Sequence, residues 1–191
     1  MVGNKIKEGR SVGFLRALNF SAEKHRIQRR KDRNKSPYIN HPIAVVHLLA
    51  TVGEVFDDTT LAAAVLHDTI EDTETTREEL DITFGIEIRR LIDEVTDDKK
   101  LVKQDRKRLQ IEHAPHLSRR AKLIKLADLS CNLADVIDHP PVEWSSERRC
   151  DYLAWTEKVI AGCRGTNDKL EQHYDRLIRK GRQALRCKLG R

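Results

Sequence analysis

Three short segments of this 191-residue chain carry side chains that bind divalent metals. The first segment holds His41, the second holds His67 followed directly by Asp68, and the third holds Asp128. Two imidazole nitrogens and two carboxylate oxygens suit Mn²⁺ or Fe²⁺ and admit Zn²⁺, whereas a structural zinc site usually includes cysteine. A metal held by such a set activates water, so these residues predict hydrolytic chemistry.

Two further acidic residues, Glu71 and Asp72, follow the His-Asp pair closely. We expect one helix over residues 59–72, in which His67 lies four residues before Glu71 and Asp68 lies four before Asp72. Side chains four apart share a face of a helix, so the four polar groups are predicted to form one broad face. Burial of that face is costly unless a cation occupies it.

Each of these signals also has a simpler interpretation. A His-Asp dipeptide is common by chance, and a single helical aspartate such as Asp128 is more often a surface or capping residue than a ligand. The acidic run that begins at Glu71 is also compatible with a solvent-exposed helix end. The combination of the three segments is therefore more informative than any one of them.

Helical periodicity dominates the elements that must position these side chains. Apolar residues recur at three- and four-residue spacings, as in Ile88, Leu91, Ile92 and Val95, and strand signals are nearly absent. Pro42 suits a first helical turn, Thr76 and Glu79 form a capping box, and Gly85 is a stop signal. The pattern predicts an all-α fold with helices at 12–30, 42–53, 59–72, 76–84, 86–96, 103–113, 119–138, 146–163 and 167–184.

Composition restricts the class of protein. A chain of 22.0 kDa is most simply one domain, here residues 1–191 with a core at about 22–180. No apolar run can span a membrane and the first ten residues lack an apolar signal segment, so we expect a cytoplasmic protein. The four scattered cysteines predict neither a disulfide framework nor a thiolate site, and reduced thiols are expected. The net charge of +6 favours an anionic partner without identifying it.

The sequence around the predicted metal ligands resembles that of a known family. His41, His67-Asp68 and Asp128 match the H…HD…D pattern of the HD phosphohydrolases. The longer match, from about residue 22 to 180, is to the hydrolase domain of RelA/SpoT-type enzymes and especially to the small metazoan SpoT homologues. The segments that carry this resemblance are Arg29–Asp32, Ser36–Ile43, Leu66–Thr73, Glu94–Lys99 and Lys125–Asp128.

The resemblance implies an all-helical HD domain that binds one Mn²⁺ and removes the 3′-pyrophosphate of ppGpp, and also of pppGpp, to give GDP or GTP and pyrophosphate. The implied metal ligands are His41, His67, Asp68 and Asp128. The acidic pair, Glu71 and Asp72, would orient or deprotonate the attacking water, since a base must lie within hydrogen-bonding reach of it. The implied partner is a guanine nucleotide, and neither nucleic acid nor a membrane is expected.

Substrate contacts are also implied by matching family positions, and these residues are Arg30, Lys31, Lys103, Asn132, Arg148 and Tyr152. Arg30 and Lys31 lie in a basic run that is otherwise interpreted as a solvated helix end, and Lys103 lies in a second charged run. A clamp on pyrophosphate oxygens is the functional interpretation. Trp144 and Trp155 are predicted to be core residues without a chemical role.

One segment departs from the family pattern. Related enzymes usually carry a basic residue after the third-site aspartate and an aromatic or histidine before the asparagine, where this chain has Leu129 and Cys131. The ligands themselves are retained, but a contact that orients them is expected to differ, with an effect on rate or substrate preference.

Three functions fit the sequence. The first is ppGpp hydrolysis without synthesis, because nothing after Asn132 resembles a pyrophosphokinase. The second is an HD phosphatase that acts on another phosphorylated nucleotide such as NADPH. The third is a non-catalytic nucleotide sensor, against which the complete set of metal-binding and acidic residues argues.

Overall fold

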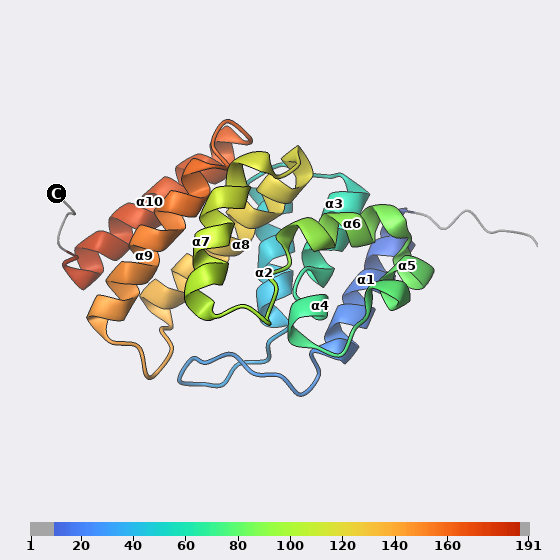
Figure 1. Ribbon diagram of the computed structural model, residues 1–191, viewed down its shortest axis with the longest axis horizontal. Helices are drawn as coiled ribbons and strands as arrows, with labels where there is room; N and C mark the ends of the chain where they lie inside the picture. The colour runs from blue at the N-terminus through green and yellow to red at the C-terminus, as the bar shows by residue number, and fades with distance from the viewer. Residues whose placement is uncertain (1–9, 188–191) are drawn as a thin grey trace, which may run out of the picture.

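The computed structural model describes residues 10–187, and within that range it has helices, no strands and one isolated bridge between Arg29 and Pro37 (Figure 1). The predicted all-α class is confirmed. The α-helices are α1 (Arg10–Lys24), α2 (Asn40–Thr51), α3 (Asp58–Leu66), α4 (Thr69–Asp72), α5 (Arg77–Phe84), α6 (Ile86–Val95), α7 (Lys103–His113), α8 (Arg119–Asp138), α9 (Ser146–Ala161) and α10 (Asp168–Leu185), and the short 3₁₀ helix η1 (Ala114–His116) precedes α8.

The longest helix, α8, lies between two groups of helices. It packs against α2, α3 and α6 on one side and against α9 and α10 on the other (Figure 1). Eleven of its side chains are buried, and they include the periodic apolar residues Leu126, Leu129, Leu133, Val136 and Ile137. A helix buried on several sides is fixed in both position and rotation, so it is a rigid support for Asp128.

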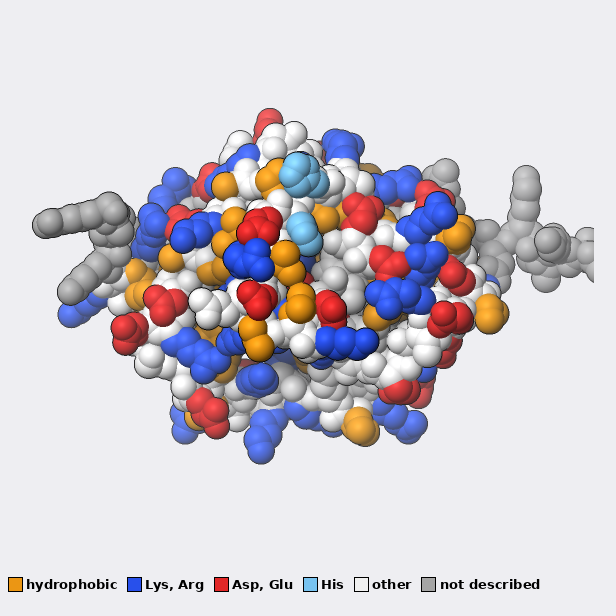
Figure 2. All heavy atoms as spheres, in the orientation of Figure 1, with side chains coloured by type: hydrophobic (Ala, Val, Ile, Leu, Met, Phe, Trp, Pro, Cys, Tyr) orange, Lys and Arg blue, Asp and Glu red, His pale blue; other side chains and the backbone are white. Residues whose placement is uncertain are grey.

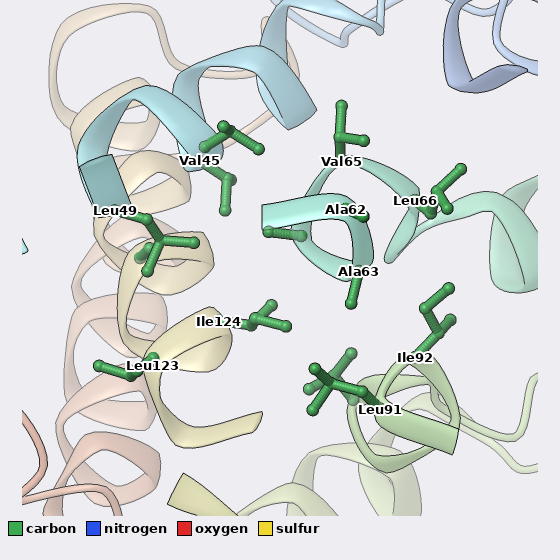
Figure 3. Packing of buried hydrophobic residues seen from close by; sticks show 14 of the residues in the cluster. Val45, Leu49, Ala62, Ala63, Val65, Leu66, Leu91, Ile92, Leu123 and Ile124 are labelled. Atoms are coloured by element: carbon green, nitrogen blue, oxygen red, sulfur yellow. The ribbon is translucent and has the colours of Figure 1, made fainter. Parts of the chain in front are cut away.

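Apolar side chains of α2, α3, α6 and α8 meet in one cluster. In Figure 3, Val45, Leu49 and Ile124 lie to the left of Ala62 and Ala63, and Ile92 lies below them to the right. The alanines of α3 let its neighbours approach closely, because a small side chain keeps helix axes near each other. This cluster holds together α2, α8 and the end of α3, the elements that carry the metal-binding residues.

The helix start and stop signals predicted from the sequence are found at helix ends in the structure. Pro42 lies in the first turn of α2, Thr76 accepts a hydrogen bond from the Glu79 N–H at 3.1 Å, and Gly85 ends α5 with φ of 88°. A glycine adopts this backbone conformation without the steric cost that other residues incur.

The first predicted helix was wrong at its C-terminal end. α1 ends at Lys24, and residues 25–39 form a loop in which the Arg30 N–H donates to Ser36 O and the Tyr38 N–H donates to Gln28 O. The carboxylate of Asp32 accepts from both the backbone N–H and the hydroxyl of Ser36. Such side-chain bonds give the backbone an alternative to the helix. The basic run is therefore a loop over a cavity and not a solvated helix end.

The expectation of four reduced cysteines was also wrong. Cys150 and Cys187 form a disulfide with their Cα atoms 5.6 Å apart, while Cys131 and Cys163 are free. The two paired residues are 37 positions apart, so their spacing in the sequence carries no signal. They meet because α9 and α10 pack against each other, which brings the end of α10 to the first turns of α9.

The surface carries both signs of charge. Basic and acidic side chains alternate over the face drawn in Figure 2, with no continuous basic area across it. No helix within residues 10–187 is long and apolar enough to cross a membrane. The expectation about a signal segment concerns residues that lie largely outside this described range.

Reduction of the disulfide is expected to lower thermal stability. Closing a loop of 37 residues removes chain entropy from the unfolded state, which corresponds to roughly 3–4 kcal/mol in the chain-entropy model. At about 2–4 °C per kcal/mol for a chain of this size, the oxidised protein should melt roughly 6–15 °C above the reduced protein. Thermal unfolding followed by circular dichroism, with and without reductant, measures this difference.

The matched control is Cys187→Ser, whose melting temperature should not respond to reductant. Thiol titration of the denatured, unreduced parent should give two free thiols among its four cysteines. A count of four would contradict the pairing.

Candidate metal centre

The His-Asp pair lies at a break between two helices, which corrects the prediction of one helix over residues 59–72. α3 ends at Leu66 and α4 begins at Thr69. The Thr69 hydroxyl donates to Leu66 O at 2.7 Å, and His67 Nδ1 lies 2.8 Å from Ala64 O. These side chains occupy carbonyls near the end of α3, and they orient the His67 ring. His67 and Asp68 therefore lie at the end of α3 and not on one face of a continuous helix.

Three predicted ligands from three helical segments converge. His41 comes from the first turn of α2, His67 follows α3, and Asp128 lies in the middle of α8. One donor atom of each lies within 4.8 Å of the other two. Both histidines are buried, and Asp128 is partly buried. Side chains 26 to 87 residues apart in the sequence thus form one compact donor group.

The donor atoms are suited to a cation. His67 Nδ1 donates its proton to Ala64 O, so in the neutral ring Nε2 presents a lone pair. This buried atom has no hydrogen-bond partner in the described chain. His41 Nε2 lies 3.0 Å from Asp128 Oδ1, and His67 Nε2 lies 3.7 Å from the same oxygen. A divalent cation would satisfy the unpartnered nitrogen and the shared carboxylate together. The residues present fit a metal ion.

The electrostatics of the donor group lead to the same conclusion. Burial disfavours the charged imidazole of His67, but the carboxylates of Asp68 and Asp128 outweigh this and raise its pKa to about 9. Burial likewise disfavours ionised Asp128, yet His41 and His67 hold its pKa well below the usual value. Negative charge concentrated here favours any cation that can enter, either a proton or a metal.

Asp68, the fourth predicted ligand, borders the donor group. Its Oδ1 lies 3.2 Å from His67 Nε2, and its Oδ2 lies 3.8 Å from His41 Nε2. The Tyr38 hydroxyl donates to Asp68 Oδ2 at 2.7 Å, and the Tyr38 ring stacks on His25 at 4.8 Å between ring centroids. Tyr38 thus orients this carboxylate, a role that the sequence alone did not indicate. Ligation by Asp68 stays a prediction.

A chain of hydrogen bonds supports Asp128 from the other side. The Asn132 amide donates to Asp128 Oδ1 at 2.6 Å, and Arg30 donates to Asn132 Oδ1 at 3.0 Å and to Asp135 Oδ2 at 2.6 Å. The Nη2 nitrogen of Arg30 therefore already donates to two protein groups. Its predicted substrate contact, like that of Asn132, stays a prediction.

The two residues that depart from the family pattern lie beside this chain of hydrogen bonds. Leu129 is buried in the apolar cluster around α9 and α10, and Cys131 borders the large cavity described below. Burial and the neighbouring carboxylates of Asp128 and Asp135 raise the pKa of the Cys131 thiol to about 12, so it is neutral. Neither residue contacts the ligands through a hydrogen bond in the described chain, and Asn132 orients Asp128 instead.

Glu71 and Asp72 differ in charge state. Burial and the carboxylates of Asp97 and Asp68 raise the pKa of Glu71 to about 7. Burial opposes the ionisation of Asp72 as well, but Lys99 and Gln28 donate hydrogen bonds to it and its pKa falls below the usual value. One carboxyl group is thus suited to exchange a proton near neutral pH and the other stays ionised, which is a common arrangement for acid–base chemistry.

Two cavities adjoin the metal centre. The larger, about 710 Å³, is bordered by His41 and Asp72 together with the loop 25–39, and the smaller, about 240 Å³, is bordered by His67, Asp68, Glu71 and Asp128. Asn132, Trp144 and Tyr152 border both. The metal-binding residues therefore lie where two chambers meet, and the larger chamber has the volume of a typical small-molecule site.

The other predicted substrate contacts line these chambers or stand at their edge. Arg30 and Lys31 border the larger cavity, Lys103 borders the smaller one, and Arg148 stacks on the Trp144 ring at 4.5 Å. Trp144 and Trp155 are partly buried, as predicted for core residues, but both also face the smaller cavity. Arg106 and Lys107 border the same cavity and were missed, because a charged helical run gives no indication of which side chains point inward.

Comparison with known proteins now identifies the family. A model of the HD domain matches residues 17–150. The chain is 52% identical over 165 residues to the guanosine-3′,5′-bis(diphosphate) 3′-pyrophosphohydrolase MESH1 of Xenopus tropicalis, over 86% of this chain and 92% of that protein. It is 49% identical over 167 residues to human MESH1, over 87% and 93% of the two chains. The chain belongs to the MESH1 group of HD-domain proteins.

Solved structures agree with this membership of the HD-domain family. One, described as a metazoan ortholog of SpoT that hydrolyses ppGpp, superposes with a TM-score of 0.86 at 45% identity, over 93% of this chain and 97% of that chain. The resemblance to metazoan SpoT homologues and the expected HD fold are both confirmed. The His-His-Asp group is the metal site typical of HD-domain phosphohydrolases.

Loss of the Tyr38 hydroxyl should weaken metal binding. Tyr38→Phe keeps the ring that stacks on His25 but removes the hydrogen bond to Asp68. Asp68 is a predicted ligand, and loss of a contact that orients a ligand typically costs about 10–100-fold in metal affinity. Titration calorimetry with Mn²⁺ measures the change.

Tyr174→Phe provides the matched control, since it also removes one phenolic hydrogen bond, the one to Thr156 at 2.8 Å, away from the metal centre. Its metal affinity should equal that of the parent. Equal affinities for all three proteins would contradict the role of Tyr38.

Proposed function

We propose that the protein is a guanosine-3′,5′-bis(diphosphate) 3′-pyrophosphohydrolase, as the relatives MESH1 of Xenopus tropicalis and of human are named. The observation that carries the proposal is the convergence of His41, His67 and Asp128, with Glu71 and Asp72 beside them, at the junction of two cavities. A sequence that had lost the activity would have little reason to retain the whole set. We further propose Mn²⁺ as the metal, Asp68 as its fourth ligand, and pppGpp as a second substrate.

The reaction consumes one water molecule. The water oxygen forms a bond to the phosphorus attached to the ribose 3′-oxygen, and the bond between that phosphorus and the 3′-oxygen breaks. The 3′-oxygen takes a proton and becomes the hydroxyl of GDP, while the two phosphates leave as pyrophosphate. A bound divalent cation supplies Lewis-acid activation of water and of phosphoryl oxygens.

The side chains of this protein are assigned the proton transfer, the orientation of water and the support of the metal-binding carboxylates. Glu71, whose pKa is about 7, accepts the proton from the attacking water, and ionised Asp72 orients that water. Asn132 and Tyr38 hold the carboxylates of Asp128 and Asp68 in place. Since both chambers adjoin these groups, the scissile bond can lie between them.

The nucleoside is assigned to the larger cavity because only that cavity has the volume for it. Tyr152 and Trp144 offer ring surfaces there, and Asn132 offers an amide for hydroxyl recognition. Lys31, Lys103 and Arg148 form no ion pair within residues 10–187, so their charges remain for phosphate oxygens. The proposed substrate is a small guanine nucleotide, and the proposed location is the cytoplasm.

A second candidate is hydrolysis of another phosphorylated nucleotide such as NADPH. The replacement of a basic residue by Leu129 beside Asp128 supports this alternative, because it places an apolar side chain at the border of the smaller cavity. A sensor without catalysis is the third candidate, and the retention of Glu71 and Asp72 beside the converging donor group argues against it.

Mn²⁺-loaded protein should release pyrophosphate and GDP from ppGpp, with little orthophosphate from NADPH. Asp128→Asn should reduce kcat by at least about 10³-fold, since it removes the charge of a metal-binding carboxylate that contacts both histidines. Glu71→Gln should reduce kcat by about 10²–10⁴-fold, the usual contribution of a general base. Ion chromatography of the products, at fixed metal concentration, measures both anions.

Asp138→Asn serves as the control, because Asp138 lies on the same helix and pairs with Lys180 on the surface. Its turnover should match that of the parent. Orthophosphate from NADPH without pyrophosphate from ppGpp would establish the second candidate, and nucleotide binding without turnover in the parent would establish the third.

A further inference from the structure

The smaller cavity has a wall of positive charge that the proposed function does not yet use. Lys103, Arg106 and Lys107 of α7 border it, together with Lys125 of α8. His67, Asp68, Glu71 and Asp128 border the same cavity. A chamber of about 240 Å³ between a metal-binding group and several cations is too small for a nucleotide but suits a compact polyanion.

Arg106 has the most distinctive position in this wall. Its Nη1 lies 3.5 Å from Glu71 Oε1, a distance too long for a strong bond, and its Nε is buried without a hydrogen-bond partner in the described chain. Buried donors in proteins are normally satisfied, and those that are not often mark a ligand site. The guanidinium group presents several donors in a plane that matches phosphate oxygens.

The neighbouring lysines add charge that the protein does not neutralise. Lys107 Nζ lies 4.8 Å from the ring centroid of Trp155 and 5.8 Å from that of Tyr152. Neither Lys103 nor Lys107 forms an ion pair within residues 10–187. Burial lowers the pKa of Lys103, and the nearby Arg148, Lys31 and Arg106 cations lower it further. Crowded cations without carboxylate partners are unfavourable unless an anion binds among them.

We propose that Arg106, together with Lys107, binds the leaving pyrophosphate in the smaller cavity. The inference rests on the proposed function, in which cleavage at the metal centre separates the nucleoside in the larger cavity from pyrophosphate in the smaller one. Arg106 then contacts the anion from its position beside Glu71, where its Nη1 lies 3.5 Å from Glu71 Oε1 at the border of the cavity.

Product inhibition tests this assignment. Arg106→Gln should raise the inhibition constant of pyrophosphate by about ten-fold or more, because loss of a charged partner in a partly buried site has effects of at least that size. The inhibition constant of GDP should change by less than about two-fold. Arg106→Lys keeps the charge without the planar group and should give an intermediate value for pyrophosphate.

The matched control is Arg108→Gln on the same helix. Arg108 is exposed and pairs with Glu112 at 2.9 and 3.0 Å, so both inhibition constants should equal those of the parent. The rise in melting temperature on adding pyrophosphate to Mn²⁺-loaded protein gives a second readout that needs no turnover. This rise should be smaller in Arg106→Gln and unchanged in Arg108→Gln.

The outcomes separate two failures. A parent that releases no pyrophosphate from ppGpp would remove the proposed function. A parent that is active, with an unchanged inhibition constant of pyrophosphate in Arg106→Gln, would overturn the inference alone. An equal rise for GDP and pyrophosphate would also overturn it, since Arg106 would then act on the whole site. If Arg106→Gln does not fold, the same comparison with Arg106→Lys decides the question.

Discussion

The contact between Asp128 and two buried imidazoles is the constraint on which the rest of the site depends. Burial disfavours this carboxylate, and the charge of protonated His67 and the contact with His41 at 3.0 Å offset that cost. Once a metal takes the place of the proton, both histidines must be neutral, as ligation requires. The same residues thus form a self-consistent group without metal and a ligand set with it, so the protein can fold before the cation enters.

This constraint explains why the central helices pack as they do. Asp128 must meet side chains from α2 and from the end of α3, and the cluster that includes Leu49, Ala63 and Ile124 fixes those elements against α8 (Figure 3). The break after Leu66 matters as much as the packing. At this break the Thr69 hydroxyl donates to Leu66 O, and the bond from His67 Nδ1 to Ala64 O fixes the orientation of the His67 ring.

Sequence reasoning succeeded where the signal was local or periodic. The buried faces of α6 and α8, the cap at Thr76 and the stop at Gly85 follow from spacing and residue type. The failures involve either local side-chain bonds to the backbone or contacts between distant segments. Nothing near His67 in the sequence shows that its side chain and that of Thr69 bind backbone carbonyls. The pairing of Cys150 with Cys187 depends on how α9 and α10 pack, and Tyr38 acquires a role only because the loop 25–39 folds back on Asp68.

The distribution of charge around the site follows from its position between two chambers. Asp128 and Glu71 lie beside the predicted cation site. The unpaired cations Lys103 and Lys107 lie on α7, where pyrophosphate is proposed to leave. Two cations beside the acidic residues do form ion pairs, Arg106 with Glu71 and Lys99 with Asp72. Lys107 and Arg148 instead stack on the rings of Trp155 and Trp144, which do not neutralise their charge. The rings predicted to be only core residues therefore preserve the positive charge that a phosphorylated ligand requires.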